Sequence, residues 1–358
     1  YQQPLADALQ EDRRRLLRVD AFRSLIFTGL ITGLILLYQT GKIRVNLAII
    51  LLAVLFLADL WPVNKRYLNS SHFESKRKAA QPFSPTPADQ FIMNSAGPNE
   101  RVLNLTVSMF QDASTPYFHQ SIGGYHGAKM RRYQDLIETR IMDNVNSLFA
   151  ALQTQNYRKV DSTLAHTNAL NMLNTRYIII NPETQPIVNR HAMGNAWFVH
   201  RVNVVEDADR EIAALGSLDL EREATLDERF ADQIPVTSFS EDTSASIGLV
   251  EYQPDRMVYR SRSATEQLAV FSEIYYEKGW EVTIDGEPAD HYRMNYTLRG
   301  LVVPEGEHEI VFEFHPRAYY TGSVISTVSS ILLLLLLAGA IYLNYRNGRF
   351  ETKPLIEV

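Results

Sequence analysis

The 358-residue sequence contains no cysteine, and it has no surplus of basic residues. Without thiols the chain can form no disulfide, use no cysteine nucleophile and bind no metal through cysteine. Acidic residues number 41 against 35 lysines and arginines, which gives a net charge of −6. Because nucleic-acid-binding proteins usually carry a basic surplus, the composition predicts no nucleic-acid partner.

The common catalytic motifs are also absent from the sequence, which has no H-E-x-x-H, G-x-S-x-G, Walker loop or G-x-G-x-x-G. His119 and His126 are two histidines without a third ligand, a pattern more typical of hydrogen-bonded or surface residues than of a metal site. The segment Glu307–Glu309 lies in an expected strand, whose alternation separates its carboxylates from His308. We expect no metal and no cofactor, and we assign no catalytic residue.

Long apolar runs lie near both ends of the chain. Val324–Leu343 is uncharged, and at about 1.5 Å per residue its helix matches a bilayer core of about 30 Å. Ala21–Trp61 contains two shorter apolar runs, separated by the polar segment Gln39–Arg44. The sequence therefore predicts one membrane-spanning helix near the C-terminus and two near the N-terminus.

A buried helical hairpin of a soluble domain is the alternative for the N-terminal pair, because each run is shorter than about 18 residues. Tyr38, Trp61 and Tyr342 lie at the ends of apolar runs, as interfacial aromatic residues do. Arg23 is long enough to extend its charge toward the interface. These residues favour a hairpin that spans the membrane.

Three spans would place the large middle region on one side of the membrane, but the charges do not decide which side. The side of the Gln39–Arg44 loop has fewer basic residues than the side of the middle region, which by the positive-inside rule predicts a cytoplasmic middle region. Long domains cross the membrane largely regardless of charge, which weakens this inference. The residues counted are Lys42, Arg44, Arg346, Arg349 and Lys353 on the first side, and Arg13, Arg14, Arg15, Arg18, Lys65, Arg66, Lys76, Arg77 and Lys78 on the second.

The middle region divides by pattern into two parts. Helix and strand signals alternate in the first part, with an expected strand at Arg101–Val107, a long helix at Ala128–Leu152 and a strand at Asn195–Val205. After a polar linker, the second part contains only strand signals and turns, which suggests a small antiparallel sandwich. The expected fold is thus an α+β membrane protein. Its predicted parts are a juxtamembrane segment (1–20), two transmembrane helices (21–61), an α/β domain (62–232), a linker (233–246), a β-sandwich (247–320), a transmembrane helix (321–343) and a cytoplasmic tail (344–358).

Several blocks of sequence resemble, in this order, the C-terminal part of the bacterial YfhO-type membrane proteins. The resemblance implies a much longer polytopic protein similar to lipid-linked-sugar transferases of the GT-C type, whose N-terminal transmembrane portion is missing here. It also implies a multi-pass protein of the bacterial inner membrane with its soluble region outside the cytoplasm. The catalytic acidic residue of such enzymes lies in an early loop that this sequence does not contain. The blocks are Asp59–Asn69, Tyr117–His119, Gly123–Ile137, Ala169–Ile180, Gly194–Val199, Phe271–Pro288 and Met294–Pro316.

The stretch Ser121–Gln134, SIGGYHGAKMRRYQ, is the best candidate for a binding site. Its glycines would let a ligand approach the backbone, and basic side chains follow at the expected start of a helix near Gly127, where an anion is favoured. The alternative is a turn followed by the solvated basic face of an amphipathic helix. The predicted substrate-binding residues are His119, Gly123, Gly124, Tyr125, His126, Lys129, Arg132 and Tyr133.

Two classes of function remain open from the sequence. In the first, this region covers the membrane-embedded site of a glycosyltransferase of the cell envelope and binds a lipid-linked sugar or a glycan acceptor. In the second, it is a non-catalytic envelope protein whose sandwich binds glycan or protein. Trp280, on an expected strand, is considered separately as a sugar-stacking platform. Packing of Trp280 in the core is the alternative for that residue.

Overall fold

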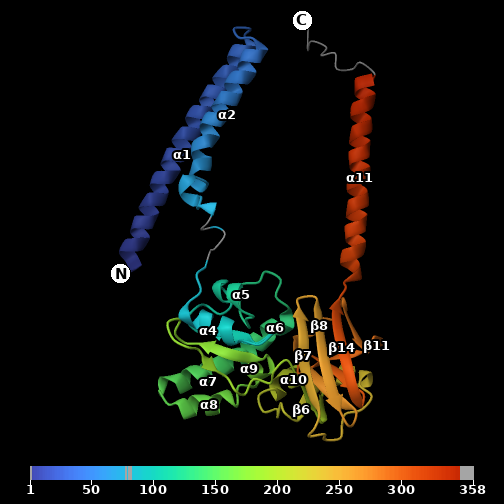
Figure 1. The fold of residues 1–358 in the computed structure, drawn as a ribbon. Helices are drawn as coiled ribbons and strands as arrows, with labels where there is room; N and C mark the ends of the chain where they lie inside the picture. Colours follow the sequence, from blue (N-terminus) through green and yellow to red (C-terminus); the bar gives the residue numbers. More distant parts are fainter. Residues whose placement is uncertain (1, 77–78, 80–82, 347–358) are drawn as a thin grey trace. The chain divides into compact units, whose positions relative to one another are not determined.

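The computed structural model describes residues 2–76, 79 and 83–346 (Figure 1). Residues 347–358 of the expected cytoplasmic tail lie outside this description. The chain divides into two units, Tyr1–Ser84 and Pro85–Val358, and each is described by itself.

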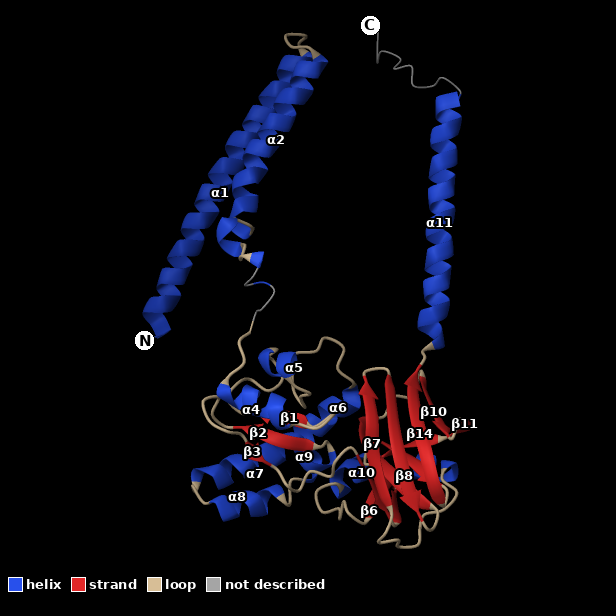
Figure 2. Cartoon of the chain, viewed as in Figure 1, coloured by secondary structure: helices blue, strands red, loops and turns tan. Residues whose placement is uncertain are grey.

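The first unit is a pair of long helices, α1 (Gln2–Gln39) and α2 (Val45–Tyr67), followed by the short helix η1 (Ser70–His72) (Figure 2). Stretches 10–39 and 45–72 are both long and apolar enough to cross a membrane, so the predicted hairpin of spanning helices is confirmed. Arg23 of α1 lies with its Nε 3.1 Å from Oδ1 of Asp59 of α2. Charged residues within such helices are usually paired in this way, since an isolated charge in the bilayer is costly.

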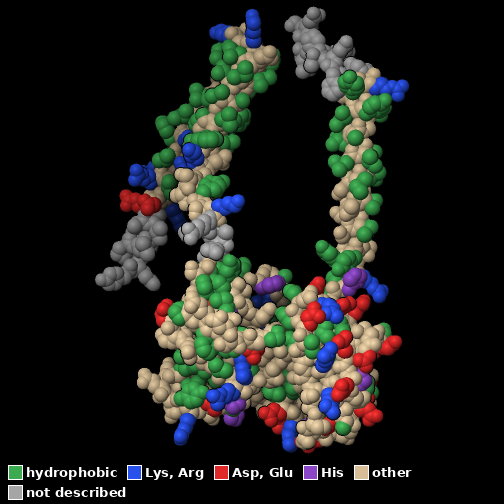
Figure 3. Space-filling model, viewed as in Figure 1, with side chains coloured by type: hydrophobic (Ala, Val, Ile, Leu, Met, Phe, Trp, Pro, Cys, Tyr) green, Lys and Arg blue, Asp and Glu red, His purple; other side chains and the backbone are tan. Residues whose placement is uncertain are grey.

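The predicted C-terminal span is confirmed as α11 (Arg317–Arg346). Its leucine run Leu332–Leu337 is exposed, and hydrophobic side chains cover α11 as they cover α1 and α2 (Figure 3). A helix with exposed apolar side chains all round requires an apolar solvent, which a bilayer provides.

The first half of the second unit combines short helices with small sheets. β1 (Arg101–Asn104) pairs in parallel with β2 (Thr175–Ile179), which pairs antiparallel with β3 (Ile187–Val188); β5 (Arg201–Val205) pairs in parallel with β6 (Glu223–Asp227). The helices are α4 (Pro87–Ser95), α5 (Ser114–Phe118), α6 (Arg131–Leu136), the π-helical segment η2 (Ile137–Ile141), α7 (Met142–Gln153), α8 (Tyr157–Leu164), α9 (Asn168–Met172), α10 (Ala208–Ala214) and η3 (Glu228–Gln233).

Two expected elements differ from the sequence prediction. The long helix begins at Arg131, not near Gly127, because Gly127 and Ala128 form a turn and Met130 has an extended backbone as the N-cap. The single strand expected at Asn195–Val205 is two strands, β4 (Ala196–Val199) and β5, which belong to different sheets. The apolar pattern continues across His200, so it gave no sign of the break.

The second half is a sandwich of two antiparallel sheets, as predicted. One sheet has the strand order β11-β10-β14-β8-β7 and the other β12-β13-β9-β4. Their facing side chains form a core in which the rings of Tyr259, Phe271 and Phe312 meet edge to face. The strands are β7 (Ser246–Gln253), β8 (Arg256–Ser263), β9 (Gln267–Ile274), β10 (Trp280–Ile284), β11 (Glu287–Ala289), β12 (His291–Met294), β13 (Leu298–Val303) and β14 (Gly306–Phe314).

Strand β9 is buried on both faces and joins the two halves. Ala269 and Phe271 pack into the sandwich core, whereas Leu268 and Val270 pack into a second, larger core with the helices of the first half. Successive side chains on a strand point to opposite faces, so β9 contributes to both cores. The predicted division at residues 233–246 stays a prediction, although the larger core crosses it and β4 pairs with β9.

Candidate functional site

A cavity of about 380 Å³ lies beside the stretch singled out from the sequence. We call it the glycine-loop cavity. Five of the eight predicted residues line it: Gly123, Gly124, His126, Lys129 and Tyr133. The other lining residues are Arg101, Phe110, Ser121, Ile122, Ala128, Met130, Leu173 and Ile274.

The two glycines are required by packing of the loop itself. A Cβ at Gly123 would lie 2.0 Å from the carbonyl oxygen of Met109, and the amide of Gly124 donates a hydrogen bond to that same oxygen. Gly124 has a φ of +108°, a conformation that side chains disfavour. The glycines therefore fix the loop against residues 108–112, which explains them without a ligand.

Tyr133 ties the loop to the helix that follows it. Its hydroxyl donates to the carbonyl oxygen of Ile122 at 2.6 Å, and burial raises the pKa of Tyr133 to about 12. The phenol is therefore neutral and acts as a hydrogen-bond donor at physiological pH.

Two basic side chains from distant parts of the sequence reach the cavity wall. Lys129 donates to Oε1 of Gln134 at 3.1 Å, and its ammonium lies 5.0 Å from the centre of the Phe110 ring. Arg101, at the start of β1, donates to the carbonyl oxygens of Leu173 and Ser272 and pairs with Glu273 at 3.1 Å. Lys129 is held by a neutral amide and a ring, so its charge is available to a ligand.

His126 belongs to the loop and faces the same cavity. Its Nδ1 accepts a hydrogen bond from the amide of Ala128 at 3.0 Å. This contact closes the turn before Lys129 and leaves Nε2 as the ring nitrogen that can contact a ligand.

The three remaining predicted residues lie elsewhere. His119 is buried against Asp89, with Nε2 2.8 Å from Oδ1. Burial alone would raise the pKa of Asp89, but hydrogen bonds from Thr86, together with His119, hold it below its usual range. The side chain of Tyr125 is exposed, and Arg132 lines a different cavity. Lys129 and Arg132, three residues apart, thus do not share the glycine-loop cavity.

Sequence reasoning missed Arg101, Phe110, Leu173 and Ile274. Arg101 opens a strand and Leu173 precedes one, so each has a local role that hides its place in the wall. Only the pairing of β1 with β2, and the packing of β9 beneath them, brings these residues together.

Trp280 is a packing residue in this structure. The guanidinium of Arg299 lies 4.0 Å from the centre of its ring, and the Phe314 ring lies 5.2 Å away. Arg299 is itself buried, and this burial lowers its pKa. The stacking of these side chains supports the packing role of Trp280 over that of a sugar platform.

The comparisons agree with the architecture. Residues 242–326, which include strands β7 to β14 and the start of α11, match the sequence model of the family described as bacterial membrane protein YfhO. No curated protein and no solved structure matches the chain significantly. The match confirms the resemblance seen in the sequence blocks from Phe271 to Pro316, and over residues 242–326 the chain is similar to the bacterial membrane protein YfhO.

Proposed function

We propose that the glycine-loop cavity binds the anionic part of an amphipathic, lipid-linked ligand. The protein would do so as part of a lipid-linked-sugar-dependent glycosyltransferase that acts on glycans of the bacterial cell envelope. In this proposal residues 85–314 lie outside the cytoplasm, on a multi-pass protein of the inner membrane, and cover the membrane-embedded site.

The observation that carries the proposal is the composition of the cavity wall. The wall contains three basic side chains, those of Lys129, Arg101 and His126, and none of the lining residues is acidic. The greater part of the wall is apolar, formed by side chains such as Phe110, Met130 and Ile274. A ligand that combines a phosphate with an apolar portion matches both features, whereas a free sugar matches neither.

The chain order supports a ligand that comes from the membrane. Residues 85–314 follow the span at 45–72 and precede the span at 317–346, so both ends of the folded region are tied to the bilayer. Lipid-linked ligands are therefore present at high local concentration beside this region.

The structure changes the residues on which the proposal rests. The second cation in the cavity wall is Arg101, whereas Arg132 does not line this cavity. The helix begins at Arg131, so no helix N-terminus is available near Gly127 to bind an anion. Lys129 remains the central residue, because its ammonium has no carboxylate partner among its described contacts.

Binding of a short isoprenoid phosphate to the purified protein in detergent tests the proposal, with the matching isoprenoid alcohol as the uncharged ligand. A charge-assisted contact contributes about 1–3 kcal/mol, so Lys129→Gln should weaken binding of the phosphate by about tenfold or more. The control is Arg131→Gln, since the Arg131 side chain is 82% exposed and lies outside the cavity wall. Equal affinity for phosphate and alcohol, or unchanged binding by Lys129→Gln, would contradict the proposal.

A further inference from the structure

A second cavity, of about 520 Å³, adjoins the first. We call it the arginine cavity and define it by Arg132, Arg293, Lys278, Tyr275 and Tyr276, which all line it. Met130 lines both cavities, and the neighbouring residues Ile274 and Tyr275 line one each. The two cavities therefore meet at Met130 and near the end of β9.

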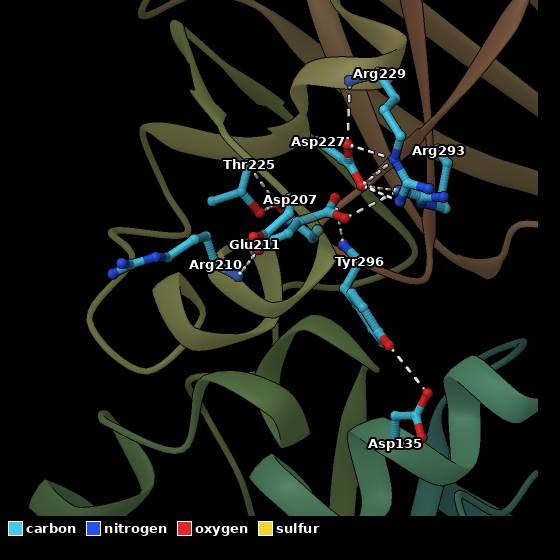
Figure 4. Close-up of polar contacts among 10 residues, drawn as sticks. Asp135, Asp207, Arg210, Glu211, Thr225, Asp227, Arg229, Arg293 and Tyr296 are labelled. Carbon is cyan, nitrogen blue, oxygen red and sulfur yellow. Dashed lines mark hydrogen bonds and ion pairs between the residues drawn. The ribbon is translucent and has the colours of Figure 1, made fainter.

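Arg293, which lines the arginine cavity, belongs to a group of charged residues that pair with one another (Figure 4). Glu211 accepts from Nη2 of Arg293 at 3.0 Å and from the backbone amide of Tyr296 at 2.9 Å. Asp227 pairs with Arg229 and lies 3.7 Å from Arg293. The two carboxylates, both fully buried, thus balance Arg293 and Arg229.

Arg132 is a third cation in this group and lacks such a partner. Among the described residues it forms no ion pair; its guanidinium lies 5.0 Å from the centre of the Tyr296 ring. Its Nη1 is buried without a hydrogen-bond partner, and so is Nε of Arg293. Burial, and next the charge of Arg293, lower the pKa of Arg132. Arg132 is half-buried, and an unpaired cation that has lost part of its hydration is costly; a bound anion would offset that cost.

We propose that the arginine cavity binds the oxyanion of a hydrophilic ligand, a phosphate or a carboxylate such as a phosphorylated or acidic saccharide carries. Arg132 and Lys278 contact the oxyanion, and Arg293 supports it from below. Tyr275 and Tyr276 offer hydroxyl groups and ring faces that suit a sugar. Glu277 also lines the cavity, so the ligand must place its uncharged part there.

This site is distinct from the lipid-phosphate site proposed above, because its wall contains Arg132, Lys278 and Arg293 and shares only Met130 with the wall of the first cavity. The inference therefore stands whether or not the glycine-loop cavity binds lipid. If both sites bind their ligands, a lipid-linked and a water-soluble substrate would lie side by side.

Calorimetric titration of the purified full-length protein with inorganic phosphate, glucuronate and glucose tests the inference. We expect phosphate or glucuronate to bind and glucose not to bind. Arg132→Gln should weaken binding of the anion by about tenfold or more, since a charge-assisted contact is lost. The control is Arg131→Gln, which should leave binding of the anion within about twofold of the original, because the Arg131 side chain is 82% exposed and lies outside both cavities.

If Arg132→Gln does not fold, Lys278→Gln provides a second test of the inference. Lys278 is exposed, so its replacement should leave the thermal midpoint unchanged while weakening binding of the anion by about threefold. Three results would overturn the inference: no binding of either anion by the original protein, equal binding by glucose, or full binding by a folded Arg132→Gln or Lys278→Gln variant.

Discussion

At the residue scale, Gly123 allows the closest test of the loop that forms the first cavity. A methyl group there meets the Met109 carbonyl oxygen at 2.0 Å, so the loop must shift. Overpacking of this kind costs about 1–3 kcal/mol, and we expect Gly123→Ala to lower the free energy of unfolding by that amount. Thermal or chemical unfolding of the purified protein measures it.

Gly127 is the matched control for this experiment. A Cβ at Gly127 meets no atom within 4 Å, and its φ is not in the positive range. Gly127→Ala should therefore leave stability nearly unchanged. If the two variants were equally stable, the close contact with Met109 would not be what requires Gly123.

A second residue-scale prediction concerns the pH dependence of the contact between the β10–β11 turn, which contains Asp285, and His308 of β14. His308 has Nδ1 2.7 Å from Asp285 and Nε2 3.0 Å from the carbonyl oxygen of Glu305. The contact with Asp285, and next that with Glu305, raise the pKa of His308 above 6.5. Since the raised pKa belongs to the folded state, the stabilisation is complete below pH 6.5 and is lost as pH rises through the raised value.

The thermal midpoint should therefore fall as the pH is raised from about 6 to about 8, and His308→Gln should reduce that fall. His166→Gln, which removes an exposed histidine from the end of α8, serves as the control and should keep the original slope. A slope in His308→Gln equal to that of the original protein would show that this pair does not contribute.

Single residues also show where sequence reasoning stopped. The Gly-Gly turn, Lys129 and Tyr133 were recognisable because they lie in one short stretch, and the structure does bring them to one cavity. The sequence did not show that Lys129 and Arg132 line different cavities. That difference depends on where the helix starts and on the positions of β9 and β12. The partner of His119 could not be predicted either, since Asp89 lies 30 residues away.

At the scale of elements, hydrophobic periodicity located the long helix of the first half and the all-strand character of the second half. Ile137, Ile141, Val145 and Leu148 recur at the spacing of one helix face, and all four lie in the larger core. Asp207 caps α10, because its Oδ1 accepts a hydrogen bond from the amide of Arg210. The pattern did not show that β4 leaves the first half to join the sheet of β9. Pairing between strands is decided by tertiary contacts, which local periodicity does not contain.

That pairing leads to a prediction about the segment 233–246. A protease site placed at the exposed residues 235–238 should be cut while the protein is folded. The two fragments should then elute together in detergent, because β4 pairs with β9 from Ala196–Phe271 to Val199–Leu268 and one core crosses the cut. Separation of the fragments without denaturant would indicate two independent units, whereas denaturant should separate them in either case.

At the scale of the whole molecule, composition alone predicted the three candidate spans. Length and hydropathy are local properties, which is why the two apolar runs predicted within 21–61 and the span predicted at 321–343 overlap the longer stretches 10–39, 45–72 and 317–346. The side of the membrane is not local, and here the count of basic residues favours the cytoplasm for the folded region whereas the resemblance favours the outside. The proposed function requires that the folded region lie outside the cytoplasm.

Labelling of a single introduced cysteine tests that requirement most directly, because the chain has no cysteine of its own. Ser240 is exposed within the folded region, and Lys42 is exposed in the loop between the first two spans. In intact cells a membrane-impermeant thiol reagent should label Ser240→Cys, while Lys42→Cys should react only after lysis. The opposite result is labelling of Lys42→Cys in intact cells and of Ser240→Cys only after lysis. That result would place the folded region in the cytoplasm and contradict the proposed function.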